Sequence, residues 1–294
     1  MVERALRVPV DRGELIATLF NDGAAGAPVV AIHGITANHR SWVGLAEQLD
    51  APILAVDLRG RGGSRSLPPP YTLVQHADDV GAAIAHAQLP PAVVVGHSMG
   101  AFVATRLAER HPGQVAATVL VDGGLPLPPP PPGVTVTLEQ ALGPVVDRLR
   151  MTFPDRAAYR DFYRQHPALG PYWNPQIEAY VDYDLVEVDG QLRPSPNLEA
   201  VATNFAELDG SGGYAEALEQ IASPRVLLTC PRGLFDETPG LYSGEWLAHW
   251  RARLPDLAVA EVPDTNHFTI VFGPQVRAVA DAVRSLTAGG DGLG

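Results

Sequence analysis

Short runs of Val, Ile, Leu and Ala recur along the chain, and more polar segments of helical length separate most of them. The apolar runs predict eight strands, which we place within residues 5–10, 14–19, 28–34, 52–62, 92–98, 117–124, 225–236 and 257–267. The intervening pattern predicts helices over 41–49, 72–89, 99–110, 241–254 and 274–287. Continuous apolar strands that alternate with helices are typical of a mostly parallel sheet covered by helices on both faces. The pattern therefore predicts an α/β fold.

This alternation stops after Gly124, where the sequence LPLPPPPPG places consecutive prolines at Pro128–Pro132. We interpret the proline run as a stiff spacer rather than a motif that docks a partner. Helices without buried strands are predicted beyond it, over 137–152, 155–165, 174–184, 197–208 and 212–221. The sequence thus predicts a core made of residues 1–124 and 223–288, with residues 125–222 inserted as a helical cap. Residues 289–294 are predicted to be a disordered tail.

In the sequence VVVGHSMG, an apolar run ends at Gly96. Ser98 follows it, and Gly100 lies two residues after the serine. A serine between glycines at a strand-to-helix junction is typical of a sharp, strained turn that exposes the hydroxyl. This turn would lie at the carboxyl edge of the sheet, where open α/β folds bind ligands. We therefore predict that Ser98 is a nucleophile.

A serine hydroxyl is a weak nucleophile unless a base lies within hydrogen-bonding reach and a carboxylate orients that base. His267, in the loop PDTNHFTIV after the last strand, is the predicted base. Asp236 follows the preceding strand and is the favoured carboxylate. Asp122, at the end of the run ATVLVDGG, is the alternative, and the sequence leaves both open.

The oxyanion that forms when a serine attacks a carbonyl group needs two hydrogen-bond donors. The backbone N–H of Met99, at the start of the helix after Ser98, is one predicted donor. The N–H of Ile35 is the other, because the tight turn His33–Gly34 would direct it at the same point.

Composition narrows the choice of partners. The net charge of −12 argues against nucleic acid or an anionic membrane surface. All 21 basic residues are Arg, which excludes chemistry that needs a lysine, and the single cysteine, Cys230, excludes an intramolecular disulfide. Glu3, Arg4 and Arg7 stand where a signal peptide would need an apolar segment, and no apolar run is long enough to span a membrane. We therefore expect a soluble, cytoplasmic protein.

Taken in order, HGITANHRSW, VDLRGRGGS, GHSMGA, GLFDE and NHF resemble the α/β-hydrolase fold superfamily, and more closely its esterase- and lipase-like branch with a helical cap. The resemblance spans about residues 14–287. It implies a catalytic triad of Ser98, His267 and Asp236, with an oxyanion hole formed by Ile35 and Met99.

The same resemblance implies that the stretch DLRGRGGS is mostly a structural turn, so we give Asp57 and Arg59 no catalytic role. Its glycines also lack the spacing of a dinucleotide-binding motif. The implied chemistry needs no metal and no organic cofactor.

We expect a serine hydrolase that cleaves a carboxylic ester of a small, largely apolar substrate through an acyl-enzyme intermediate. Hydrolysis of a lactone, a thioester or a C–C bond, and acyl transfer, are compatible with the same triad. Ser98 argues against the epoxide hydrolases and haloalkane dehalogenases of this fold, which use an Asp nucleophile, and the lack of lysine argues against hydroxynitrile lyases. The non-enzymatic alternatives are a hydrolase-like protein that only binds a small ligand, and a scaffold whose proline run binds a partner.

Overall fold

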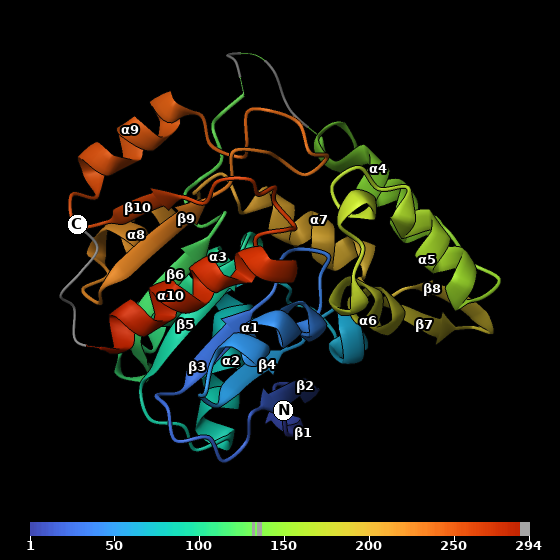
Figure 1. Ribbon diagram of the computed structural model, residues 1–294, viewed down its shortest axis with the longest axis horizontal. Helices are drawn as coiled ribbons and strands as arrows, with labels where there is room; N and C mark the ends of the chain where they lie inside the picture. Colours follow the sequence, from blue (N-terminus) through green and yellow to red (C-terminus); the bar gives the residue numbers. More distant parts are fainter. Residues whose placement is uncertain (131–132, 134–136, 289–294) are drawn as a thin grey trace.

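The computed structural model describes residues 1–130, 133 and 137–288 (Figure 1). One sheet contains β1 Glu3–Val10, β2 Gly13–Phe20, β3 Val29–Ile32, β4 Ile53–Val56, β5 Ala92–His97, β6 Val115–Val121, β9 Arg225–Thr229 and β10 Ala258–Glu261. Their order across the sheet is β1-β2-β4-β3-β5-β6-β9-β10. β2 is antiparallel to β1 and β4, and every other neighbouring pair is parallel. The predicted α/β fold with a mostly parallel sheet is confirmed, and each predicted strand run overlaps one of these strands.

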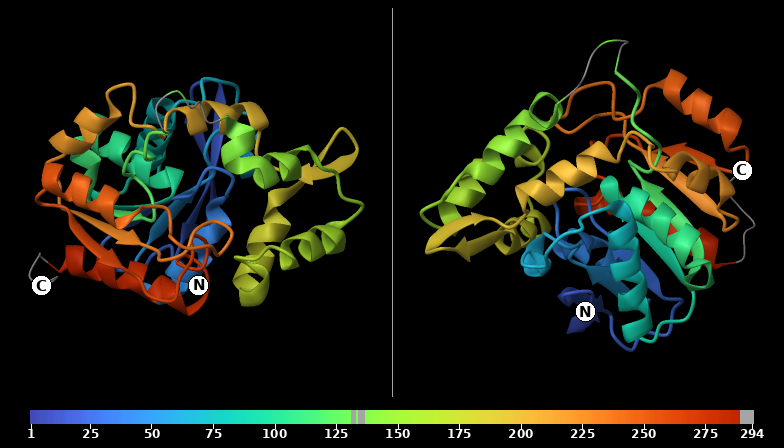
Figure 2. Two further views of the ribbon diagram at one scale, coloured as in Figure 1. Left: turned by 90° about the horizontal axis from the view of Figure 1, so that it is seen from above. Right: turned by 180° about the vertical axis from the view of Figure 1, so that it is seen from behind.

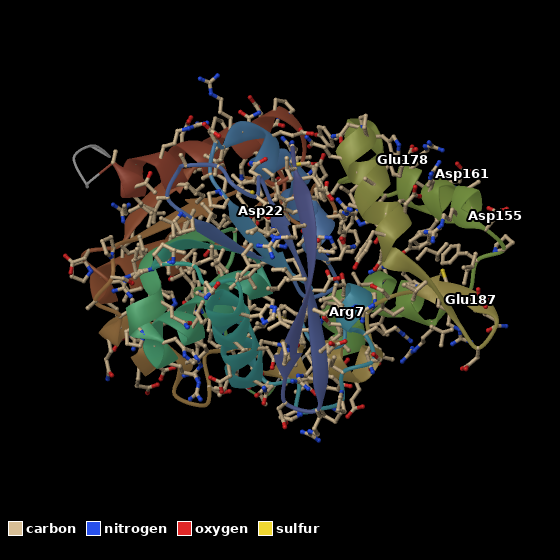
Figure 3. All side chains as sticks on the ribbon, turned by 90° about the horizontal axis from the view of Figure 1, so that it is seen from below. Arg7, Asp22, Asp155, Asp161, Glu178 and Glu187 are labelled. Atoms are coloured by element: carbon tan, nitrogen blue, oxygen red, sulfur yellow. The ribbon has the colours of Figure 1, made fainter. Side chains whose placement is uncertain are left out.

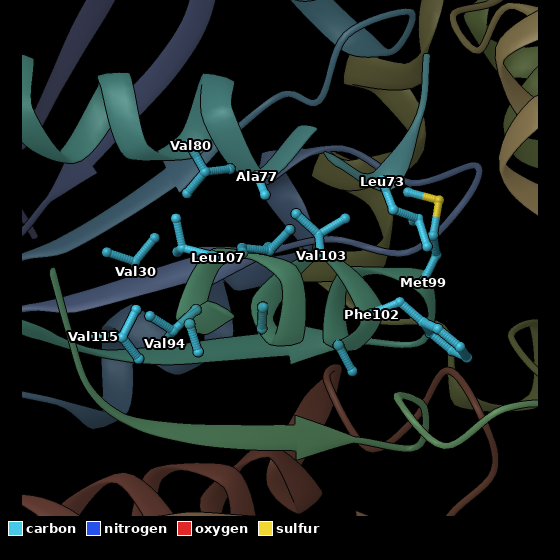
Figure 4. Packing of buried hydrophobic residues seen from close by; sticks show 14 of the residues in the cluster. Val30, Leu73, Ala77, Val80, Val94, Met99, Phe102, Val103, Leu107 and Val115 are labelled. Carbon is cyan, nitrogen blue, oxygen red and sulfur yellow. The ribbon is translucent and has the colours of Figure 1, made fainter. Parts of the chain in front are cut away.

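The two faces of the sheet are buried in two separate apolar clusters. On β3, Val30 and Ile32 belong to one cluster, whereas Val29 and Ala31 belong to the other. The first cluster is covered by α2 Leu73–His86, α3 Met99–Arg110 and α9 Gly244–Arg253, and the second by α1 Val43–Gln48 and α10 Val276–Thr287. Figure 4 shows side chains of α2 meeting those of α3 beside the sheet. Because successive strand residues point to opposite faces, apolar residues are needed at every position, which explains the continuous runs in the sequence.

The insertion between β6 and β9 contains helices and a two-stranded hairpin. Its elements are α4 Leu138–Arg150, α5 Arg156–Arg164, α6 Pro175–Asp184, β7 Leu185–Val188, β8 Gln191–Pro194, α7 Leu198–Ala206 and α8 Tyr214–Gln220. The prediction of an all-helical insertion missed the hairpin. Its turn is Asp189–Gly190, with φ angles of 52° and 74°, and an Asp-Gly pair at positive φ is a strong hairpin signal. The two strands are short and mostly not buried, so the apolar pattern did not reveal them.

Parts of the insertion lie in different places. Helices α5 and α6 and the hairpin project away from the sheet (Figure 2), and Asp155, Asp161, Glu178 and Glu187 lie around this projecting part (Figure 3). Helix α8 instead packs on α3, where the rings of Phe102 and Tyr214 are 4.8 Å apart. Helix α8 therefore packs on a helix of the core, although it falls within the predicted cap.

The turn after β4 anchors the insertion to the core. Asp57 is fully buried and accepts hydrogen bonds from the backbone N–H of Gly63 and, at 2.6 Å, from the hydroxyl of Tyr183 on α6. The backbone N–H of Gly62 donates to Ser195 Oγ at 3.0 Å, just after β8. Burial alone would raise the pKa of Asp57, but the neighbouring His39 ring, which also hydrogen-bonds to it, and the hydroxyl of Tyr183 hold the pKa well below its usual range. The turn thus has a structural role.

Five 3₁₀ segments complete the described structure: His39–Trp42, Gly62–Ser64, Pro112–Gln114, Gly170–Tyr172 and Gly273–Gln275. The predicted tail, 289–294, and Pro131 and Pro132 of the proline run lie outside the described residues. Across residues 1–130 and 137–288, no helix is both long and apolar enough to cross a membrane.

Candidate active site

Ser98 lies in a sharp turn between β5 and α3, with φ at 55° and ψ at −123°. Two glycines make the turn possible. A Cβ atom on Gly96 would lie 2.2 Å from the carbonyl oxygen of Gly100, and one on Gly100 would lie 2.1 Å from that of Ile32. Gly123 is a third, which the sequence reading did not single out, because its Cβ would lie 2.3 Å from the carbonyl oxygen of Ser98. Only glycine allows three backbone segments to approach this closely around one serine.

The ring of His267 is held by a buried carboxylate. Nδ1 of His267 donates to Oδ2 of Asp122 at 2.6 Å, and Asp122 is fully buried. The other carboxylate oxygen, Oδ1, accepts the backbone N–H of Cys230 at 3.1 Å. Asp122 directly follows β6, the neighbour of β5 in the sheet, so its side chain lies one strand away from Ser98. This arrangement leaves Nε2 of His267 as the basic nitrogen of the ring.

Asp236, the favoured acid, is bonded to groups other than the ring of His267. Its Oδ1 accepts hydrogen bonds from Arg232 Nε at 2.7 Å and from Asn266 Nδ2 at 2.8 Å, and its side chain is 30% exposed. Both strand ends open onto the same edge of the sheet, so spacing along the chain could not separate the two candidates. The ion pair with Arg232 directs Asp236 toward its own loop, while Asp122 already occupies the position next to the ring of His267.

His97 positions the loop that carries His267. Its Nε2 donates to the backbone carbonyl of His267 at 2.7 Å. Burial, together with the neighbouring His267 ring, holds the pKa of His97 well below its usual range, so the ring is a neutral donor. The sequence pattern does not predict this contact, because nothing in a local pattern shows which backbone group a buried ring reaches.

His33 orients one of the two predicted oxyanion donors. Its Nε2 accepts the backbone N–H of Leu58 at 3.0 Å, so the ring proton is on Nδ1, which donates to the carbonyl oxygen of Gly34 at 2.8 Å. Burial lowers the pKa of His33 to about 4, which keeps the ring neutral. In a trans peptide the C=O and N–H point in opposite directions, so holding the Gly34 carbonyl also fixes the direction of the Ile35 N–H.

Two small cavities meet at Ser98. One of about 50 Å³ and one of about 60 Å³ share Ile35, Ser98, Leu142, Leu234 and His267 as lining residues. The predicted donor Met99 lines the second of these. Within the described chain, no Arg, Asp or Glu lines either cavity.

The structure brings together Ser98, His267, Asp122, Ile35 and Met99, and leaves Asp236 outside this group. Among the described residues, no three His, Cys, Asp or Glu side chains are grouped as a metal ion would require.

Comparisons with known proteins agree with this architecture. A family model described as the alpha/beta hydrolase family matches residues 29–282. The chain is 27% identical over 269 residues to 2-(acetamidomethylene)succinate hydrolase of Mesorhizobium japonicum, which covers 91% of this chain and 90% of that protein. It is 42% identical over 102 residues to lipase LipV of Mycobacterium tuberculosis, but this covers only 34% of this chain and 39% of the lipase. The crystal structure of an E-2-(acetamidomethylene)succinate hydrolase shares the fold, with a TM-score of 0.76, 23% identity and coverage of 97% of this chain and 99% of that chain. The chain belongs to the alpha/beta hydrolase family.

Proposed function

We propose that this chain is a serine hydrolase that cleaves a carboxylic ester of a small, uncharged and largely apolar substrate. One observation carries the proposal: Ser98 and His267 line the same cavity, and the buried Asp122 holds the ring of His267. The strained turn at Ser98 supports it, because a serine at the apex of a strand-to-helix turn presents its hydroxyl to the cavity above the sheet.

In the proposed cycle, Nε2 of His267 takes the proton of Ser98 while Oγ attacks the ester carbonyl. Asp122 keeps the proton on Nδ1, and its negative charge stabilises the imidazolium that forms. His267 then gives the proton to the departing alcohol. A water molecule activated by the same ring hydrolyses the acyl-enzyme, and the cycle uses only water and groups of the chain. Asp122 takes the role that the sequence reading favoured for Asp236.

The backbone N–H groups of Ile35 and Met99 are the proposed donors to the oxyanion. In the part of the chain that the structure describes, neither N–H donates to another protein group. The bond from His33 to the Gly34 carbonyl fixes the Ile35 N–H before substrate arrives. Donors held in place before the reaction need no reorganisation as charge develops, and this accounts for most of their effect.

The lining of the two cavities favours an uncharged substrate. The relative from Mesorhizobium japonicum is named for a succinate derivative, and carboxylates are commonly bound by Arg. In this chain the described lining of both cavities contains no Arg, and apolar side chains such as Leu142, Leu234 and Phe272 form most of it. We therefore favour an apolar ester over a dicarboxylic acid as the substrate. Turnover of a dicarboxylic acid in preference to every neutral ester would reverse this choice.

The proposal is tested by hydrolysis of a p-nitrophenyl ester series, from acetate to palmitate, by the wild type and by Ser98→Ala. We expect kcat/KM of the variant to fall by about 10³-fold or more, because the nucleophile is lost. Ser211→Ala, in an exposed loop, is the matched control and should keep full activity. A folded wild type that hydrolyses no ester, or a Ser98→Ala variant as active as the wild type, would contradict the proposal.

A further inference from the structure

An apolar channel leads from Ser98 to the proline-rich segment. The cavity of about 60 Å³ at Ser98 and His267 adjoins an outer chamber of about 750 Å³. Both are lined by Leu127, Leu142, Phe205, Leu234 and Leu241. The outer chamber extends to Pro128–Pro130. Because the same five side chains border both spaces, the two are successive sections of one path, which we call the Leu241 channel.

The lining of the Leu241 channel suits a hydrocarbon chain. Apart from Ser98 and His267, the described residues of the inner section are all apolar. The outer section adds one charged residue, Asp209, which is exposed. A polar chain would lose its hydrogen bonds to water here without replacing them, whereas each buried methylene strengthens binding by about fourfold.

Two leucines border both this channel and the cavity on the other side of Ser98. Leu142 and Leu234 line the inner section, the outer section and the other cavity. Leu142 lies in α4 with non-helical angles, φ −131° and ψ 29°, two residues before Pro144. A proline inside a helix removes a backbone hydrogen bond and kinks the helix. Leu142 therefore belongs to the kinked part of α4, and together with Leu234 it borders both limbs of the space above Ser98, the channel and the other cavity.

His267 lines both limbs, and the residues beside it and beside Ser98 distinguish them. The cavity opposite the channel is lined by Phe268, Val271 and Phe272, which lie one, four and five residues after His267 in the chain. The leaving alcohol must lie next to His267, because this ring gives it a proton. The inner section of the channel is instead lined by Met99 and Phe102 of α3, the helix that begins next to Ser98.

From this division we infer that the Leu241 channel binds the acyl chain of the substrate and that the other cavity binds the alcohol. The substrate class is then an ester of an uncharged aliphatic acid longer than butyrate with a small alcohol. This inference rests on the proposed function, and it deepens it by naming the side of the ester that sets specificity.

Narrowing and widening the channel test the inference with p-nitrophenyl acetate, butyrate, octanoate and decanoate. Leu241→Trp should lower the octanoate-to-acetate ratio of kcat/KM by at least about 20-fold, because the larger ring fills the passage between the two sections. Phe205→Ala should act in the opposite direction and raise the decanoate-to-butyrate ratio by several-fold. Leu89→Trp is the matched control: Leu89 is partly buried against the same apolar cluster but precedes β5, at the opposite end of that strand from Ser98. It should leave both ratios unchanged.

A second pair of substrates tests the orientation. Methyl octanoate carries the long chain on the acyl side, and octyl acetate carries it on the alcohol side. The wild type should hydrolyse methyl octanoate at least about tenfold faster, and Leu241→Trp should remove most of that advantage.

Two kinds of failure are distinguishable. A wild type that hydrolyses no ester contradicts the proposed function, and the inference falls with it. A wild type that is active but prefers octyl acetate, or whose chain-length ratios respond to neither Leu241→Trp nor Phe205→Ala, contradicts the inference alone.

Discussion

The carboxyl ends of the central strands and the carboxyl end of β9 both carry candidate acids, but the two regions are built differently. At the central ends, Asp122 is fully buried, and its two oxygens accept from His267 and from the backbone of Cys230. At β9, the carboxylate of Asp236 is partly exposed and paired with Arg232. A buried carboxylate whose two oxygens both accept hydrogen bonds can fix the tautomer and the direction of a histidine ring. A partly exposed ion pair mainly stabilises its own loop. The difference shows that neighbouring position in the sheet, more than order along the chain, decides which carboxylate bonds to the ring of His267.

The largest expected effect comes from removing the negative charge of Asp122, at the carboxyl end of β6. Asp122→Asn should lower kcat/KM for p-nitrophenyl butyrate by about 10³- to 10⁴-fold, because the amide stabilises the wrong tautomer of His267 and cannot stabilise its cation. Steady-state kinetics on the purified variant measure this. A loss of less than about tenfold would remove Asp122 from the proposed triad.

A smaller loss is expected at His33, which acts through the Ile35 N–H. His33→Ala should lower kcat by about 10- to 100-fold with little change in KM, because the donor is misdirected but not removed. His86→Ala, at an exposed helix end, is the matched control. An increase in KM at unchanged kcat would instead indicate a role in binding substrate.

The same replacement of an acid by an amide at Asp236, in the loop after β9, should have only a weak effect on activity. Asp236→Asn should lower kcat/KM by less than about tenfold, since the carboxylate of Asp236 bonds to Arg232 and Asn266 rather than to the ring of His267. The thermal unfolding midpoint should fall slightly, because the partly exposed pair with Arg232 is weakened. A loss comparable to that of Asp122→Asn would restore Asp236 as the triad acid.

The last prediction concerns the pH dependence of stability. Burial lowers the pKa of His33, at the central ends, and of His166, stacked on Phe235 of the β9 loop, to about 4 in each case. In the unfolded chain these histidines take up protons near pH 6.5. Their contribution to the free energy of unfolding is therefore complete above pH 6.5, and the free energy of unfolding declines as the pH falls toward 4. Urea titrations between pH 7 and 4.5 should show this decline.

The two histidines should contribute unequally to that decline. The ring of His33 is fully buried, and its share is at most roughly 3 kcal/mol, whereas His166 is only partly buried and contributes less. His33→Asn should therefore flatten the pH dependence more than His166→Asn does. Equal flattening by both would contradict the contrast between the two regions.

The sequence predicted the fold because buried parallel strands require apolar residues at every position, and such runs are visible without a structure. It also singled out Ser98 and His267 as candidates from the glycine spacing at the turn and the order of the elements, and the structure places both on the same cavities. It favoured Asp236 over Asp122, but both residues follow apolar strand runs, and the sequence alone does not show which strand end lies beside His267. The contacts of His33, His97 and Gly123 are between distant segments, so they became visible only when the strands were placed side by side.

The most direct test of the central claim is the rate at which a fluorophosphonate labels the protein, with the modified residue located by peptide mass spectrometry. We predict that the label lies on Ser98, that Asp236→Asn is labelled at close to the wild-type rate, and that Asp122→Asn is labelled at least about 100-fold more slowly. Labelling of another residue, or slow labelling of Asp236→Asn with normal labelling of Asp122→Asn, would contradict the proposed site.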